Sequence, residues 1–285
     1  MRRWLTAISV VGTVLLSTLL ALSPGAGATS RTAAGASPTD LGEPVPHALA
    51  LSSGFGTAPD GAPQAYYLFE GNATTTAEFV VVDVRSKAIV LDTRLPHGTS
   101  SARTLDFSAA DGNVYFAADD SDVSYLYRYQ PGSSSVDYLG TTLTGQRTWS
   151  LFAAQDGTIW GGTYPGGRLF SYTPSTGQIH DYGQAIAGEQ YISSITQVGD
   201  RLYVGTQPHG LLAQFDPATG TFSQIALPAD AESTGIDELY LRRNLLFAGT
   251  EGGKLLVRDL NTNSWVDEIT DFSGRGVSPV DPTTG

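Results

Sequence analysis

Apolar and polar residues alternate over short segments that are separated by Gly, Pro, Asp and Ser. The pattern is clearest across 149–183, WSLFAAQDGTIWGGTYPGGRLFSYTPSTGQIHDYG. Its four alternating segments are 149–154, 158–163, 168–173 and 178–182, and an Asp-Gly, a Pro-Gly-Gly and a Pro-Ser-Thr-Gly stretch separate them. Period-two alternation joined by such turns predicts four consecutive antiparallel strands.

The four-strand unit repeats along the chain. Leu126, Leu169, Leu212 and Leu255 recur at intervals of 43 residues, and the aromatic residues Tyr115, Trp160, Tyr203 and Phe247 recur at nearly the same spacing. Four short strands every 40–45 residues are typical of a β-propeller blade. The sequence therefore predicts an all-β propeller at 47–285, with a β-sandwich as the alternative. The predicted blades are 47–95, 103–140, 147–183, 190–227 and 234–269, with an incomplete blade from 274.

Both ends of the chain carry their own predictions. Arg2-Arg3, the apolar stretch 4–22 and Ala26-Gly27-Ala28 predict a signal peptide at 1–28, with a membrane anchor as the alternative. An Ala-, Gly- and Ser-rich linker is expected at 29–46. Because the sixth blade stops after its first turn, we expect a fragment of a seven-bladed ring. The alternative is a small propeller closed by the N-terminal segment.

Charge and composition narrow the class of partner. The formal net charge is −12, the chain has no cysteine, and no basic run follows a path that could track phosphates. Nucleic acid is therefore not expected as a partner. The acidity fits a secreted, extracellular protein. After cleavage of the signal peptide, we expect no association with the membrane. We expect a monomer.

Candidate chemistry gathers on one predicted face. In a meander, the turns between second and third strands share a face with the connections between blades. His97, Arg103, Arg147, Trp149, Tyr191, Asp237 and Arg275 occur in or beside those connections, and Tyr164 and His209 occur in those turns. A ring of blades has a concave site at this mouth. Turn chemistry can equally explain the two Pro-His-Gly sequences and Asp237, and Trp149 is interpreted as inner-strand core.

This mixture suits β-elimination on a sugar uronate. An arginine neutralises the carboxylate, a His or Tyr removes the C5 proton, and a second such group protonates the leaving oxygen. We expect His97, His209 and Tyr164 to be catalytic, and Arg103, Arg147, Tyr191 and Arg275 to bind substrate. The arginines also have a plain interpretation as rim charges. No pair of carboxylates suggests glycoside hydrolysis.

No cofactor is expected, although two acidic stretches admit a weak calcium interpretation. Asp119-Asp120-Ser121-Asp122 lacks the glycine and distal glutamate of a calcium loop. Asp259, Asn261 and Asn263 fit a turn equally well. No zinc motif, phosphate loop or nucleophile elbow is present.

The repeats GTYPGGRLFSYTPSTG, GTQPHGLLAQFDPATG and GTEGGKLLVRDLNT resemble secreted bacterial β-propellers of the WD40/YVTN and quinoprotein-like superfamilies. The run DGTIWGGTYPGGRLFSY is similar to blades of propeller-type lyases, including virginiamycin B lyase, oligogalacturonate lyase and rhamnose–glucuronate lyases. That resemblance implies a carbohydrate-active lyase with His, Tyr and Arg at the channel mouth, and a polysaccharide or oligosaccharide substrate. The alternatives are a non-catalytic binding scaffold and a propeller hydrolase or lactonase. The repeats specify blades more strongly than activity.

Overall fold

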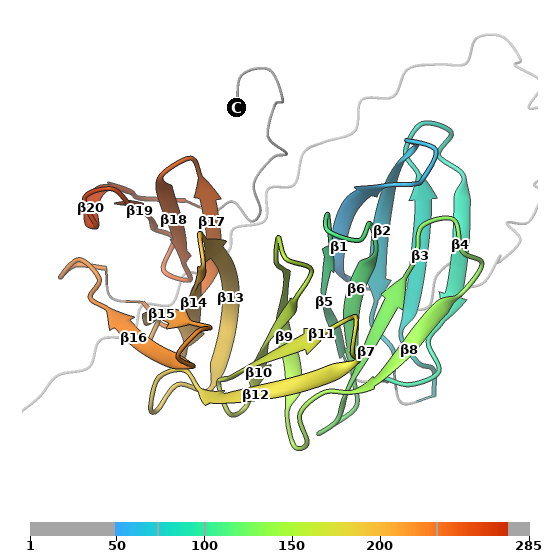
Figure 1. Cartoon of the computed structure of the whole chain (residues 1–285), viewed down its shortest axis with the longest axis horizontal. Coiled ribbons are helices and arrows are strands. Elements are labelled where there is room, and N and C mark those ends of the chain that lie inside the picture. Colours follow the sequence, from blue (N-terminus) through green and yellow to red (C-terminus); the bar gives the residue numbers. More distant parts are fainter. Residues whose placement is uncertain (1–48, 73, 100, 232, 273–285) are drawn as a thin grey trace, which may run out of the picture. The chain divides into compact units, whose positions relative to one another are not determined.

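The computed structural model describes residues 49–272 apart from 73, 100 and 232. Within these residues the chain forms twenty strands and no helix (Figure 1). Every strand belongs to one of five four-stranded sheets, and each sheet is ordered as the chain runs. All neighbouring strands are antiparallel. The predicted all-β architecture of four-stranded blades is confirmed.

The five sheets are called blades one to five. Blade one contains β1 (Ala50–Thr57), β2 (Pro63–Phe69), β3 (Glu78–Asp83) and β4 (Ile89–Arg94). Blade two contains β5 (Ser101–Phe107), β6 (Val114–Asp119), β7 (Ser124–Tyr129) and β8 (Val136–Thr141). Blade three contains β9 (Arg147–Ala153), β10 (Ile159–Tyr164), β11 (Arg168–Thr173) and β12 (Gln178–Gln184). Blade four contains β13 (Tyr191–Val198), β14 (Arg201–Gln207), β15 (Leu212–Asp216) and β16 (Thr221–Ile225). Blade five contains β17 (Ile236–Arg242), β18 (Leu245–Thr250), β19 (Leu255–Asp259) and β20 (Ser264–Ile269).

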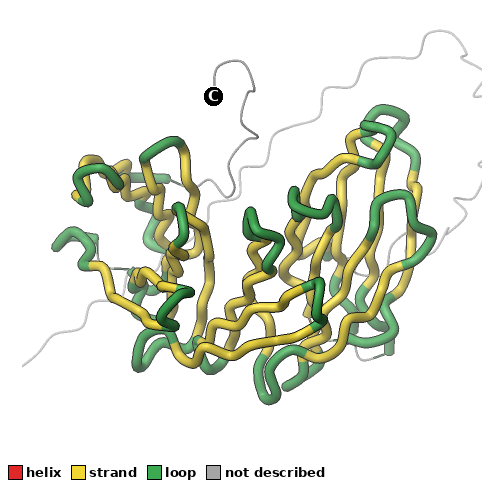
Figure 2. The backbone as a smooth tube through the Cα atoms, in the orientation of Figure 1, coloured by secondary structure: helices red, strands yellow, loops and turns green. Residues whose placement is uncertain are grey.

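Short loops connect these strands (Figure 2). In blade one, β4 begins at Ile89 because the residues before it form a turn. Lys87 lies in the preceding turn with a φ of 59° and donates its N–H to the carbonyl of Asp83 at 2.8 Å. A tight turn thus joins β3 to β4. The predicted signal peptide, the linker and the incomplete sixth blade lie outside the described residues.

The core is divided among the junctions between successive blades. The inner strands β1, β5, β9, β13 and β17 each contact the next one in this order. Tyr66 and Phe79 of blade one pack with Phe116 and Tyr127 of blade two. Three further clusters join blade two to three, three to four and four to five in the same way. Each blade is therefore held by apolar burial against its neighbours.

The repeated residues of blades two to four fill these junctions, whereas Leu255 and Phe247 of blade five are partly buried. Leu126, Leu169, Leu212 and Tyr115 are fully buried, and Tyr203 is nearly so. Burial of each such side chain contributes about 1.5–3 kcal/mol, which is why the 43-residue period is readable in the sequence.

The predicted shared face is also confirmed. Gly166 N–H in the β10–β11 turn donates to Gln146 Oε1 at 2.8 Å, just before β9. Gly167 N–H donates to the carbonyl of Gln190 at 2.7 Å in the connection between blades three and four. Turns between second and third strands therefore lie beside the connections between blades. In the described part of the chain, no helix has the length and apolar character of a membrane span.

Candidate functional site

A cavity of about 590 Å³ lies where the five inner strands begin. Each inner strand contributes to its wall: Ser52 and Ser53 from β1, Arg103 from β5, Trp149 from β9, Ser193 from β13, and Asp237 and Glu238 from β17. Leu51, Gln207 and Glu251 complete it. We call this the inner-strand cavity. A polar concave site shared by all described blades is the expected place for a ligand.

One wall carries an arginine–aromatic cluster, formed by Arg103, Trp149, Tyr164 and Tyr191. The guanidinium carbon of Arg103 lies 4.8 Å from the centre of the Trp149 ring, within range of a cation–π contact. Tyr191 meets Trp149 edge to face at 4.8 Å and stacks on Tyr164 at 4.1 Å between ring centres. Three blades thus combine a fixed cation with two phenols.

The pKa of Tyr191 is raised in this cluster. Burial is the main cause of its raised pKa, and the Tyr164 hydroxyl raises it further. Arg103 and Arg147 act in the opposite direction by favouring the phenolate. Because the net effect is upward, Tyr191 is a protonated phenol at neutral pH and can donate a proton.

Arg147 is anchored at the edge of this wall. Its Nε donates to the carbonyl of Ser121 at 2.9 Å, which links β9 to the β6–β7 turn of blade two. Burial raises the pKa of Asp119 to about 6. Hydrogen bonds from Ser124 and Thr148 and the charges of Arg103 and Arg147 oppose this shift. Arg103 and Arg147 thus share one electrostatic environment with Tyr191 and a buried carboxyl.

Three acidic side chains, Asp237, Glu238 and Glu251, also line the cavity. Asp237 Oδ1 accepts a hydrogen bond from Gln207 Nε2 at 2.5 Å, and Glu238 accepts one from the hydroxyl of Tyr240. Glu251 accepts one from Thr234 Oγ1 at 2.5 Å. The wall of the inner-strand cavity therefore carries both a cationic and several anionic side chains, which can orient a charged ligand.

His97 lies in the connection between blades one and two and packs against blade two. Its ring stacks on Tyr125 at 4.9 Å and meets Tyr138 at 5.1 Å, and both tyrosines belong to the outer strands β7 and β8. Its backbone N–H donates to Tyr127 Oη at 3.1 Å. These contacts favour the turn-chemistry interpretation of the first Pro-His-Gly.

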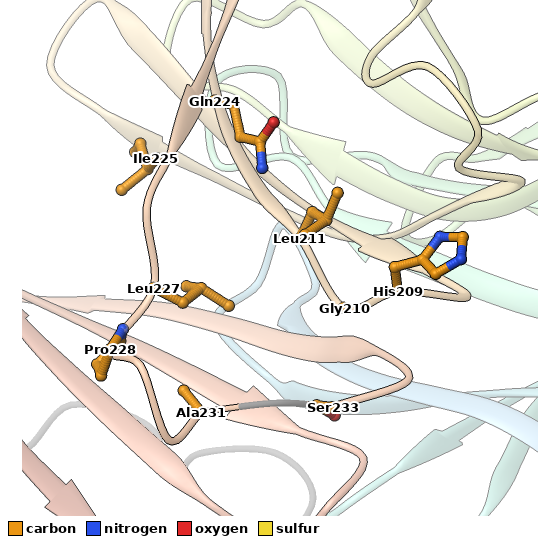
Figure 3. A pocket seen from close by; sticks show the side chains of 9 residues that line it. All are labelled: His209, Gly210, Leu211, Gln224, Ile225, Leu227, Pro228, Ala231 and Ser233. Atoms are coloured by element: carbon orange, nitrogen blue, oxygen red, sulfur yellow. The ribbon is translucent and has the colours of Figure 1, made fainter.

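His209 is in the β14–β15 turn and pairs with a buried carboxylate. Its Nδ1 lies 2.5 Å from Glu189 Oε1. The His209 side chain is 67% exposed, whereas that of Glu189 is 1% exposed. His209 also borders a groove of about 170 Å³, and its ring points away from the apolar side chains Leu227 and Ala231 (Figure 3).

The structure thus brings together some of the predicted site residues. Arg103, Tyr164 and Tyr191 share one cluster, and Arg147 joins them electrostatically. The described ring and hydrogen-bond contacts of His97 and His209 are made elsewhere, and Arg275 lies outside the described residues.

Sequence reasoning missed several residues of the cavity wall. Trp149, interpreted as core, is partly exposed and lines the cavity, and Ser193, Gln207, Glu238 and Glu251 were not singled out. A signal existed, because Trp149, Ser193 and Asp237 are 44 residues apart and occupy equivalent strand positions.

The acidic stretches considered for calcium have local hydrogen-bond partners. Asp259 Oδ1 accepts from the N–H of Asn261 at 2.7 Å and from Asn244 Nδ2 at 3.2 Å, as turn chemistry predicts. Asp120 accepts from Thr99 N–H and from the Tyr125 hydroxyl, each at 2.8 Å. Among the described residues, no three His, Asp or Glu side chains are grouped so that they could hold a metal ion.

Solved structures with a similar fold include a lyase, a synthase and BamB. A catalytically inactive virginiamycin B lyase from Staphylococcus aureus, in complex with quinupristin, is 16% identical with a TM-score of 0.61, over 79% of this chain and 73% of that one. Hydrazine synthase from Kuenenia stuttgartiensis is 13% identical with a TM-score of 0.58, over 76% and 73%. BamB from Moraxella catarrhalis is 17% identical with a TM-score of 0.50, over 78% and 62%.

These likenesses concern the fold. No protein-family profile matches the chain, and a search of curated proteins finds no match. A shared fold does not fix a function, so activity has to be argued from the site. The five four-stranded blades and these structural neighbours together show that the chain has a β-propeller fold.

Proposed function

We propose that the inner-strand cavity binds an acidic oligosaccharide of the uronate class and cleaves it by β-elimination. The arginine–aromatic cluster is the observation that carries this proposal. It places a guanidinium over an indole and two stacked phenols beside a polar cavity. Sugars present apolar C–H faces and polar edges, and a wall of aromatic rings with fixed polar groups complements both.

Arg103 is the residue that would recognise the uronate carboxylate. It is exposed at the cavity wall, and Arg147 adds a second positive charge nearby. A charge-assisted hydrogen bond to a carboxylate contributes about 1.5–3 kcal/mol. Pairing the carboxylate with arginine also acidifies the C5 proton, because it stabilises the negative charge that develops when that proton leaves.

Tyr191 is suited to the second half of the reaction. When the C5–H bond breaks, its proton passes to a base at the cavity mouth and its electron pair forms the C4–C5 double bond. The C4–O bond then breaks, and the leaving oxygen takes a proton from the phenol. The raised pKa of Tyr191 keeps that phenol protonated until the oxygen needs it.

Binding without cleavage is the second candidate. It is favoured by the position of His97, a predicted catalytic residue whose described ring contacts lie outside the arginine–aromatic cluster. A scaffold needs the cationic and aromatic wall but no proton acceptor beside it.

The test measures binding and cleavage on the same samples. Purified protein is titrated with oligogalacturonate by calorimetry, and cleavage is followed by the ultraviolet absorbance of the unsaturated uronate. Carboxyl-reduced oligosaccharide is the matched ligand. Arg103→Ala is compared with Arg128→Ala, which removes an arginine paired with Asp137 on the outer strands.

Binding and an absorbance rise that both require the carboxylate and Arg103 would support the proposal. Binding with no absorbance rise would favour the scaffold. Equal affinity for the reduced ligand, or equal loss in Arg128→Ala, would refute recognition of a uronate at this wall.

A further inference from the structure

Glu189 and His209 face each other across the open end of the β13–β14 hairpin. The strand pairing begins with Tyr191 opposite Gln207, and Gln190 N–H donates to the carbonyl of Gln207 at 2.7 Å. Two residues further out, this antiparallel register places Glu189 opposite His209. Tyr191 of the arginine–aromatic cluster is two residues from Glu189, which is about 7 Å of extended backbone.

The Glu189 carboxylate is enclosed and has defined donors. Its Oε2 accepts from Thr206 Oγ1 at 2.7 Å and from the backbone N–H of His209 at 3.2 Å. Its Oε1 lies 2.5 Å from His209 Nδ1. An ionised carboxylate can only accept hydrogen bonds, so a neutral imidazole that pairs with it carries its proton on Nδ1. The lone pair then belongs to Nε2, on a side chain that is 67% exposed.

We propose that Glu189 is a positioning residue that holds His209 in the Nδ1–H tautomer, and that His209 Nε2 accepts the C5 proton in the elimination. The inference rests on the proposed function for the identity of that proton. The tautomer of His209 does not depend on the proposed function, because it is inferred from the three hydrogen bonds of Glu189 alone. A carboxylate behind an imidazole is a general means of fixing which nitrogen is basic.

Glu189→Gln provides a discriminating change because it is nearly isosteric. The Oε2 position faces the backbone N–H of His209, which cannot turn away, so the amide oxygen of glutamine belongs there. The amide NH₂ then faces Nδ1 and makes it an acceptor. The neutral imidazole must move its proton to Nε2, and the exposed nitrogen becomes a donor that cannot take a proton.

Thr206→Val is the matched control. It also removes a partner of the buried carboxylate, and it leaves the charge and the contact with Nδ1 in place. The experiment records nitrogen NMR spectra of ¹⁵N-histidine-labelled protein and measures kcat and KM on oligogalacturonate for the wild type and both variants.

We expect Nδ1–H in the wild type and in Thr206→Val, and Nε2–H in Glu189→Gln. Because the exposed nitrogen of His209 can no longer accept a proton, kcat should fall about 100-fold or more in Glu189→Gln. KM should stay within about twofold of the wild-type value. The wild-type tautomer is informative without any variant, since Nε2–H there would overturn the positioning role. Unchanged kcat in Glu189→Gln would overturn the proton-acceptor role. Nδ1–H in a wild type that cleaves no uronate would refute the proposed function and leave the positioning role standing.

Discussion

Asp106 makes the junction between blades two and three sensitive to pH. Its Oδ2 accepts from Ala153 N–H in β9 at 2.8 Å, and its Oδ1 accepts from Phe107 N–H at 2.9 Å. Burial raises the pKa of Asp106 to about 6 from an ordinary value of 3.8, and the two backbone donors oppose the shift only in part. Desolvation of the charged form is therefore the dominant effect.

The sign of the pH effect follows from that direction. The folded protein holds this proton more tightly than the unfolded chain, so the stabilisation is present below about pH 4 and is lost as pH rises through about 6. A difference of about 2 pKa units corresponds to roughly 3 kcal/mol between those limits.

Asp106→Asn removes the titration and leaves a neutral side chain of similar shape. We expect the free energy of unfolding of the wild type, minus that of Asp106→Asn, to fall by roughly 3 kcal/mol between pH 4 and pH 7. Urea unfolding at four pH values measures this difference, and other titrating groups cancel in the subtraction. A constant difference would refute the reasoning. A difference that grows with pH would show that the two N–H donors outweigh desolvation.

Three further predictions concern stability and the proposed reaction. Gly210→Ala should destabilise the fold by at least about 1 kcal/mol more than Gly199→Ala in urea unfolding. Both glycines have a φ of 60°, but a Cβ on Gly210 would lie 2.6 Å from the Ser233 carbonyl and one on Gly199 would meet nothing within 4 Å; equal costs would contradict the close approach. Leu212→Ala should cost about 2–5 kcal/mol, because this side chain is fully buried between blades four and five; a smaller loss in the same assay would mean that the junction collapses around the gap. Tyr191→Phe should lower kcat about 100-fold or more on oligogalacturonate while the calorimetric affinity stays unchanged; equal losses of both would assign the phenol to binding.

The fold was predictable because its signals are local and repeated. Turn residues fix the hairpins, and Leu126, Leu169 and Leu212 fill equivalent junctions, so the strands and their period appear directly in the sequence. The shared face of turns and connections followed from meander geometry.

The contacts of the site could be predicted only in part. Topology placed Arg103, Tyr164 and Tyr191 on one face, but the stacking of Tyr164 on Tyr191 depends on the angle between blades three and four. Trp149 looks like core because inner strands alternate, and only the structure shows that its position faces the cavity. The two Pro-His-Gly sequences are identical in letters, yet one ring meets tyrosines and the other a buried carboxylate.

The equivalent positions along the inner strands have an evolutionary consequence. Arg103, Trp149, Ser193 and Asp237 each come from a different blade, and each blade is packed through its own junctions. A substitution at one such position changes one sector of the wall and leaves the folding signals of the repeat intact. Ligand preference can therefore drift sector by sector at little cost in stability, which explains how one architecture can serve many chemistries.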